Sequence, residues 1–181
     1  QKVFLLGFSW GAMLASAYIN QYPTAIDGAI LAEPGGLIWK DVEDYITRSR
    51  KFKYFGESLN DAVYADQFVT GKTDQHAILD YKFMLLTSQE SSEIGNEGSL
   101  QEWRGGAVTF DAYLEIGDKQ KPDWTTNLNK YTTQVLFIYS ANNKAYGLQH
   151  AQKVSAPYPS VKLFKTEGAG HDMLSFPTRW N

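Results

Sequence analysis

The chain contains no cysteine, no long apolar run and no block of basic residues. Without cysteine it can form neither a disulfide nor a thiolate metal site, and this composition suits many compartments, so localisation stays open. No apolar run approaches the roughly 18 residues of a membrane span, so the sequence predicts none. Seventeen Lys and Arg against twenty Asp and Glu give a net charge of -3, which argues against nucleic acid as a partner.

Histidine is rare in the chain, and acidic residues are missing from one long stretch. Only three histidines occur, and residues 124–166 contain neither Asp nor Glu. The 181 residues, 43% of them hydrophobic, suffice for the core of one domain or a little more. Aromatic residues make up 14% of the chain, which fits an aromatic-lined site and ordinary packing equally well.

The most informative motif is a G-x-S-x-G match at residues 7–11, centred on Ser9. It follows an apolar run at residues 3–6 and precedes a helical pattern that ends at Pro23. Strand, tight turn and helix in this order are the context in which the motif indicates a nucleophile elbow. Gly7 and Gly11 permit the turn, and the helix N-terminus brings positive dipole to the serine. We therefore predict that Ser9 is a nucleophile.

Three further apolar runs have the length and flanking turn residues of buried strands. They cover residues 25–33, 134–140 and 161–165, and a helical pattern lies between the last two, from residue 146 to about residue 154. Alternation of strands and helices favours a parallel sheet with crossover helices. The predicted fold class is α/β.

Between the second and third of the four predicted strands the pattern becomes helical. Apolar residues recur at helical spacings and glycines punctuate the stretch, so we predict a helical cap inserted into the sheet domain. The predicted organisation is residues 1–34 core, residues 35–130 cap and residues 131–181 core. An independent helical domain is disfavoured because strand pattern resumes at Gln134.

His171 is the candidate general base for Ser9. It closes the glycine-rich segment 168–171, on the loop after the last predicted strand, where an imidazole can reach over the elbow. His76 and His150 fall on predicted helices and are interpreted as surface residues. His76 and Asp80 lack a third ligand, so we predict no metal site and no cofactor.

The elbow, the helical cap and the Gly-Ala-Gly-His segment together resemble the α/β-hydrolase family, and Gly-Phe-Ser-Trp-Gly resembles the elbow of its proline iminopeptidase branch. The resemblance implies the C-terminal portion of an α/β-hydrolase sheet, with the strands before the elbow supplied by another segment of the same protein. It also implies an oxyanion hole, for which this chain offers the Trp10 amide.

The third member of the expected triad departs from the family pattern. The resemblance implies an acid on the loop after the penultimate strand, where this chain has Asn143, and an amide cannot stabilise an imidazolium as a carboxylate does. Three accounts stay open. Glu33, at the end of the neighbouring strand, is the preferred substitute; alternatively Asn143 marks a weakened enzyme, or a homologue that only binds a ligand.

The resemblance implies a serine hydrolase, most specifically an aminopeptidase that releases N-terminal residues from short peptides. Relatives recognise the free amine with cap carboxylates, and Glu102 beside Trp103 is the most suggestive pair here, because a carboxylate and an aromatic ring can hold a small cation. Phe8 of the elbow is a further candidate substrate contact. The alternative is an esterase or lactonase acting on small acyl compounds.

Overall fold

The computed structural model describes residues 1–49, 94–95 and 107–175. Its centre is a four-stranded parallel sheet in the order β1-β2-β3-β4, which confirms the predicted α/β class. All four predicted strands form, with boundaries shifted by a few residues. They are β1 (Phe4–Phe8), β2 (Gly28–Ala32), β3 (Val135–Ser140) and β4 (Val161–Thr166).

The register of the sheet brings the residues predicted for the site together at the carboxyl ends of the strands. Phe8 pairs with Ala32, and Ala32 pairs with Ile138, so β1 and β2 end side by side. Ser9 and Glu33 are the next residues along these two strands. The carboxyl ends of parallel strands are where α/β folds place their sites.

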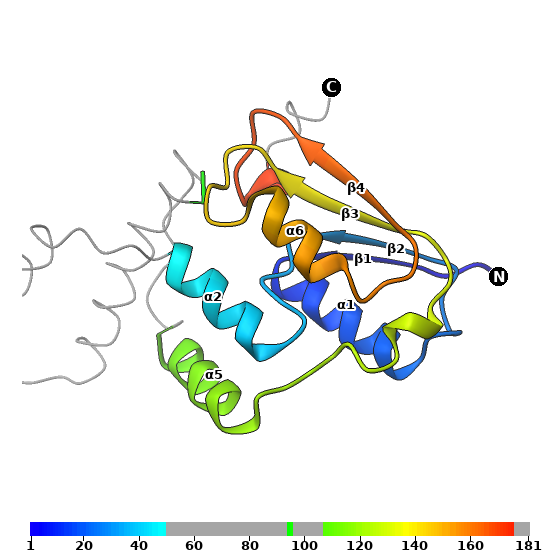
Figure 1. The fold of residues 1–181 in the computed structure, drawn as a ribbon, viewed down its shortest axis with the longest axis horizontal. Helices are drawn as coiled ribbons and strands as arrows, with labels where there is room; N and C mark the ends of the chain where they lie inside the picture. The colour runs from blue at the N-terminus through cyan, green and yellow to red at the C-terminus, as the bar shows by residue number, and fades with distance from the viewer. Residues whose placement is uncertain (50–93, 96–106, 176–181) are drawn as a thin grey trace, which may run out of the picture.

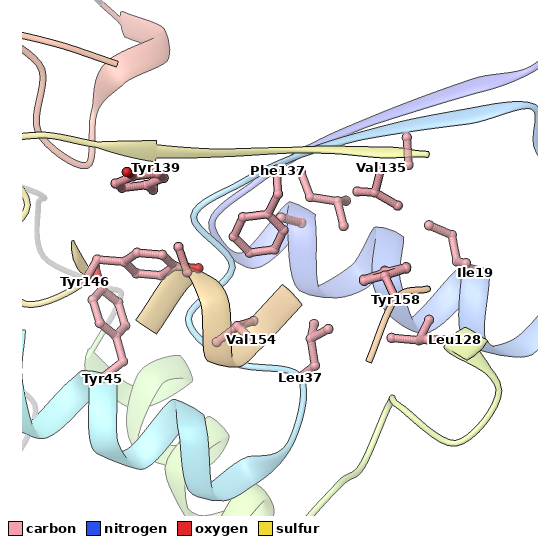
Figure 2. Close-up of a cluster of buried hydrophobic side chains, with 14 of the residues drawn as sticks. Ile19, Leu37, Tyr45, Leu128, Val135, Phe137, Tyr139, Tyr146, Val154 and Tyr158 are labelled. Atoms are coloured by element: carbon pink, nitrogen blue, oxygen red, sulfur yellow. The ribbon is translucent and has the colours of Figure 1, made fainter. Parts of the chain in front are cut away.

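One face of the sheet is covered by α1 (Trp10–Gln21) and α6 (Gly147–Ser155), which connect successive strands (Figure 1). The apolar core lies between this face and the helices. Figure 2 shows its fully buried members from the sheet, α1, α6 and the connecting loops, among them Ile19, Leu37, Leu128, Val135, Phe137 and Val154. Burial of these side chains is the main stabilising contribution to the fold.

The flank formed by β1 and α1 carries exposed apolar side chains. Phe4 and Leu6 of β1 are 66% and 65% exposed. On α1, Trp10, Leu14 and Tyr18 are exposed and follow one another at intervals of four residues, so they share one face of the helix.

Two helices from the predicted cap range pack against each other (Figure 1). They are α2 (Trp39–Ser49) and α5 (Ala107–Gln120). The Trp39 indole donates a 2.8 Å hydrogen bond from Nε1 to Asp118, and a Cβ at Gly117 would overlap the Trp39 ring. Close approach at Gly117 therefore fixes how these helices meet. The domain boundaries at residues 34 and 130 stay a prediction.

Two short 3-10 helices complete the described elements, η1 (Leu128–Lys130) and η2 (Met173–Ser175). Within the described ranges, no helix is both long enough and apolar enough to cross a membrane. Residues 50–93 and 96–106 of the predicted cap, His76 among them, lie outside the described residues.

Candidate active site

Ser9 stands at a sharp turn between β1 and α1. Its backbone is left-handed, with φ 52° and ψ -119°, a conformation that costs a non-glycine residue free energy and that clusters at functional sites. Its amide donates to the carbonyl of Ala32 at 2.8 Å, which ties the turn to β2. Its side chain makes no capping bond to α1. The hydroxyl is therefore available to another partner.

The two motif glycines contribute differently. A Cβ at Gly7 would lie 2.5 Å from the Cα of Ala12, so only glycine lets β1 and α1 approach this closely. A Cβ at Gly11 would meet no atom within 4 Å. Close packing therefore does not require glycine at position 11.

His171 is the partner of the Ser9 hydroxyl. Its Nε2 lies 2.9 Å from Ser9 Oγ. The backbone amide of His171 donates to the carbonyl of Ile94 at 2.7 Å, and a Cβ at the preceding Gly170 would overlap the backbone of Gly95. Ile94 and Gly95, which lie in the predicted cap range, thus hold the backbone that carries the imidazole.

Glu33 holds the other side of the imidazole. Its Oε2 lies 2.7 Å from His171 Nδ1, and its side chain is 0% exposed. Like Ser9, Glu33 has a left-handed backbone, with φ 43°, and its amide donates to Ile138. The chain turns directly after β2, so this carboxylate points across the sheet edge toward the loop after β4.

These contacts define the direction of hydrogen bonding. An ionised carboxylate only accepts, so the proton on the imidazole resides on Nδ1 and points at Glu33. Nε2 is then the acceptor for the Ser9 hydroxyl. The arrangement is an activated-nucleophile geometry in which a base contacts the hydroxyl and a third group orients the base.

Glu33 is a buried charge surrounded by donors. Ser140 donates to Oε1 from its amide at 2.7 Å and from Oγ at 2.5 Å, and Asn143 Nδ2 donates to Oε2 at 2.9 Å. With His171, four hydrogen bonds reach the carboxylate, two on each oxygen. Burial and the nearby Glu33 charge raise the pKa of Tyr146 well above its ordinary value of 10.

Asn143, the residue at the position expected for the acid, contacts Glu33 instead of the imidazole. It is 1% exposed, and Nδ2 also lies 3.1 Å from the Tyr45 hydroxyl. Its Oδ1 accepts from the Tyr146 amide at 3.1 Å. The contact with the imidazole that was expected of the acid is made by Glu33. Ser140 and Tyr45 give no sequence signal for this role, because their contacts span about a hundred residues.

Two aromatic side chains of the elbow lie around the serine. The Phe8 ring centroid is 5.0 Å from that of His171. Trp10 is 47% exposed and meets Tyr113 of α5 edge to face at 4.4 Å. Trp10 also opens α1, and the first amides of a helix have no acceptor within it, so its N–H can receive an oxyanion. Glu102 and Trp103 lie outside the described residues.

The interpretation of His150 as a surface residue is wrong. It is 5% exposed, and its Nε2 donates to the Gly35 carbonyl at 2.8 Å. Arg48 Nη2 donates to His150 Nδ1 at 2.8 Å. Burial lowers the pKa of His150 from its ordinary value. His150 thus braces the loop that follows Glu33, and the exposed polar residues Gln149, Gln152 and Lys153 beside it in the sequence hid this role.

Among the residues that the structure describes, no group of three or more His, Asp or Glu side chains is placed to hold a metal ion.

A family model for the α/β-hydrolase fold matches residues 1–177. The chain belongs to the α/β-hydrolase family. No curated protein sequence matches the chain.

Solved α/β hydrolases share the fold at low sequence identity. VinJ superposes with a TM-score of 0.58 at 16% identity, covering 99% of this chain and 62% of VinJ. An acetylester hydrolase from Corynebacterium glutamicum gives 0.53 at 16% identity, covering 93% of this chain and 54% of that one. A proline iminopeptidase from Mycobacterium smegmatis gives 0.52 at 15% identity, with coverages of 99% and 62%.

These comparisons bear on the fold and not on the substrate. The hydrolase chain spans about 54% to 62% of the length of these three structures. At 15% to 16% identity, proteins of one fold carry out different reactions, so the activity must be argued from the site.

Proposed function

We propose that the protein is a serine hydrolase that works through an acyl-enzyme. The observation that carries the proposal is the hydrogen-bond chain from Ser9 Oγ to His171 Nε2 and from His171 Nδ1 to Glu33 Oε2. Nucleophile, base and orienting acid are all within 2.7–2.9 Å of their partners, which is the distance that proton transfer requires.

In the first half of the proposed reaction, Ser9 Oγ attacks the substrate carbonyl carbon while His171 Nε2 takes the hydroxyl proton. The imidazolium that forms is stabilised by the buried carboxylate of Glu33. The negative charge that develops on the carbonyl oxygen is received by the Trp10 amide at the start of α1. His171 then gives the proton to the leaving group, and the bond between carbonyl carbon and leaving group breaks.

In the second half, water replaces the leaving group. His171 takes a proton from the water, whose oxygen attacks the acyl carbon, and the ester bond to Ser9 breaks as the proton returns to Oγ. Every step uses the same proton-carrying atom, Nε2, so the orientation that Glu33 imposes serves both halves.

The finer proposal is an aminopeptidase of the proline iminopeptidase type, acting on short peptides. Its support is the Gly-Phe-Ser-Trp-Gly elbow and the fold shared with a solved proline iminopeptidase. The aromatic rings of Phe8 and Trp10 beside Ser9 suit an apolar ring such as that of an N-terminal proline. Glu102 and Trp103 remain the proposed contacts for the free amine.

The second candidate is an esterase or lactonase. The shared fold with an acetylester hydrolase favours it, because the same triad geometry cleaves both bonds. Aminoacyl amides tested against simple esters discriminate the two. Faster turnover of esters that lack an amine, unaffected by Glu102→Gln, would count against amine recognition and support the esterase.

The test of the serine hydrolase proposal is labelling with a fluorophosphonate probe. In the full-length protein, Ser9 is expected to be labelled, and Ser9→Ala is expected to abolish labelling and turnover. Ser160→Ala, a serine near the start of β4 and far from the elbow in the chain, is the matched control and should leave labelling unchanged. An unlabelled Ser9 in folded protein would instead favour a ligand-binding homologue.

We also propose that further strands of the same protein cover the flank of β1 and α1. The apolar side chains exposed there, including Phe4, Leu6 and Leu14, form a surface suited to another strand and helix. A strand paired on both sides protects every amide, whereas an edge strand protects alternate ones. Hydrogen exchange in the full-length protein should therefore show slow exchange at every residue of β1; alternate fast exchange would refute the pairing.

A further inference from the structure

The loop after β3 carries donors where the family pattern has a carboxylate. Asn143, on this loop, is buried, and both ends of its amide are used. Nδ2 donates to Glu33 Oε2 at 2.9 Å, and Oδ1 accepts from the Tyr146 amide at 3.1 Å. An ionised carboxylate at this position could satisfy the second contact but not the first, because it has no proton to donate.

We propose that Asn143 is a positioning residue for the hydrolytic reaction, whose amide holds Glu33 in line with His171, so that this site works with an amide and fails with a carboxylate at position 143. The inference rests on the proposed serine hydrolase function. It gives Asn143 a defined task in place of the two readings in which it marks lost or weakened catalysis.

The geometry behind the proposal is the sharing of a single oxygen. Glu33 Oε2 accepts both from His171 Nδ1 at 2.7 Å and from Asn143 Nδ2 at 2.9 Å. Ser140 supplies both bonds to Oε1. The carboxyl group is thus held at both oxygens, and a rotation that would turn Oε2 away from the imidazole breaks the Asn143 bond as well.

Replacing the amide by a carboxylate changes the chemistry of this contact. Asn143→Asp sets two buried carboxylates against each other, and such a pair cannot both ionise at little cost. The pair retains one proton and titrates as a unit. While that proton is shared, the negative charge is divided between the two carboxyl groups, so less of it faces His171. Among the residues that the structure describes, the other titratable groups near the pair are His171, Tyr45 and Tyr146, and none of these three adds a fixed positive charge.

The two readings of Asn143 predict opposite results for Asn143→Asp. If Asn143 is a degenerate acid, aspartate repairs the triad and activity rises. If the amide positions Glu33, the variant loses about 10- to 100-fold in kcat at neutral pH, the range expected when a charged group loses a hydrogen-bond donor. KM should change little, because the Asn143 side chain is buried and contacts Glu33, not the Ser9 hydroxyl that the substrate meets.

The experiment compares wild type, Asn143→Asp and Asn143→Ala in the full-length protein, with kcat and KM measured across pH. The pH profile of Asn143→Asp should differ from that of wild type, because the carboxylate pair adds a titration that the amide does not have. Asn143→Ala should lose less and keep the wild-type pH profile. A purely structural role would lower thermal stability in both variants and leave both pH profiles alone, and that outcome would overturn the proposal.

A second readout separates this inference from the proposed function. The imidazole Nδ1 proton of His171, assigned by its absence in His171→Gln, should give a downfield proton NMR signal that moves upfield in Asn143→Asp at neutral pH. An inactive, unlabelled wild type would refute the hydrolase function, whereas an unmoved signal or a kcat at or above wild type in Asn143→Asp would refute the role of Asn143.

Discussion

Two histidines lie near Tyr45, and their partners give them opposite properties. His171 faces a carboxylate, Glu33, whereas His150 faces a guanidinium, Arg48. The Tyr45 ring centroid is 6.3 Å from that of His171 and 5.6 Å from that of His150. Both imidazoles therefore lie near the same tyrosine ring, but one contacts a negative side chain and the other a positive one.

The partners fix different tautomers. Glu33 accepts, so His171 carries its proton on Nδ1 and leaves Nε2 for the serine. Arg48 only donates, so Nδ1 of His150 accepts, and the proton on Nε2 binds the Gly35 carbonyl. A histidine that gains a positive charge during a reaction needs a negative partner, and one that braces a loop is better kept neutral.

The largest expected effect comes from removing the carboxylate charge beside His171. Glu33→Gln keeps the shape of the side chain but takes away the carboxylate that stabilises the imidazolium. In serine proteases the corresponding change lowers kcat by about 10⁴, or roughly 5.5 kcal/mol of activation free energy. Steady-state kinetics measures it. Glu167→Gln, an exposed carboxylate paired with Lys165, is the control and should retain full activity. Equal activity in both variants would contradict the role of Glu33.

A smaller effect is expected from removing the guanidinium charge beside His150. Arg48→Met leaves His150 Nδ1 and the Ala145 carbonyl without their donor. Unsatisfied buried groups cost about 1–3 kcal/mol each, and both of these contacts are only part-buried, so the two together should lower the free energy of unfolding by about 2 kcal/mol in urea titrations. Lys40→Met, on the same helix with an exposed ion pair to Asp44, should change stability by less than about 0.5 kcal/mol. An equal fall in the free energy of unfolding of Arg48→Met and Lys40→Met would show that the Arg48 contacts contribute no more than an exposed ion pair.

The pH dependence of stability tests whether His150 is kept neutral. Burial is the main cause that lowers its pKa below the ordinary 6.5, and Arg48 adds to this. Between its folded pKa and 6.5, the unfolded chain binds a proton that the folded protein does not. The free energy of unfolding should therefore fall as pH falls below about 6.5, by at most about 1.4 kcal/mol per pH unit from this group.

His150→Gln separates this contribution from those of other titrating groups. Wild type and variant should lose stability at different rates below pH 6.5, the ordinary pKa of the side chain, and at the same rate above it. Denaturant titrations at a series of pH values measure both slopes. Parallel curves over the whole range would mean that the folded protein protonates His150 as readily as the unfolded chain does.

Much of the sheet and the ends of its strands could be predicted from the sequence. Apolar runs bounded by turn residues indicate β2 and β3 because both strands are buried, and Glu33 was a candidate because it ends such a run. The partners of Glu33 could not be predicted, because Ser140 and Asn143 are 107 and 110 residues away along the chain. Pairing at that separation depends on sheet order and register, which no local pattern records.

The same reasoning explains the error at His150. Three of the neighbouring residues on its helix are exposed and polar or charged, so the local pattern suggests a surface position. Burial comes from Arg48 of α2 and from the Gly35 loop, both distant in sequence. A histidine, which can donate and accept at once, suits a place between a guanidinium and a carbonyl, but only the folded chain brings these two together.

The smallest effect concerns Tyr45, whose ring lies near both histidines. Tyr45→Phe keeps that ring and removes only the hydroxyl 3.1 Å from Asn143 Nδ2. Because Asn143 still donates to Glu33, kcat should fall by no more than about threefold, and stability should fall by about 0.5–1.5 kcal/mol, the usual contribution of one hydrogen bond. Kinetics and urea titration check both values, with the exposed Tyr18→Phe as control. A loss in kcat as large as that of Glu33→Gln would show that the tyrosine hydroxyl, and not the carboxylate, controls the imidazole.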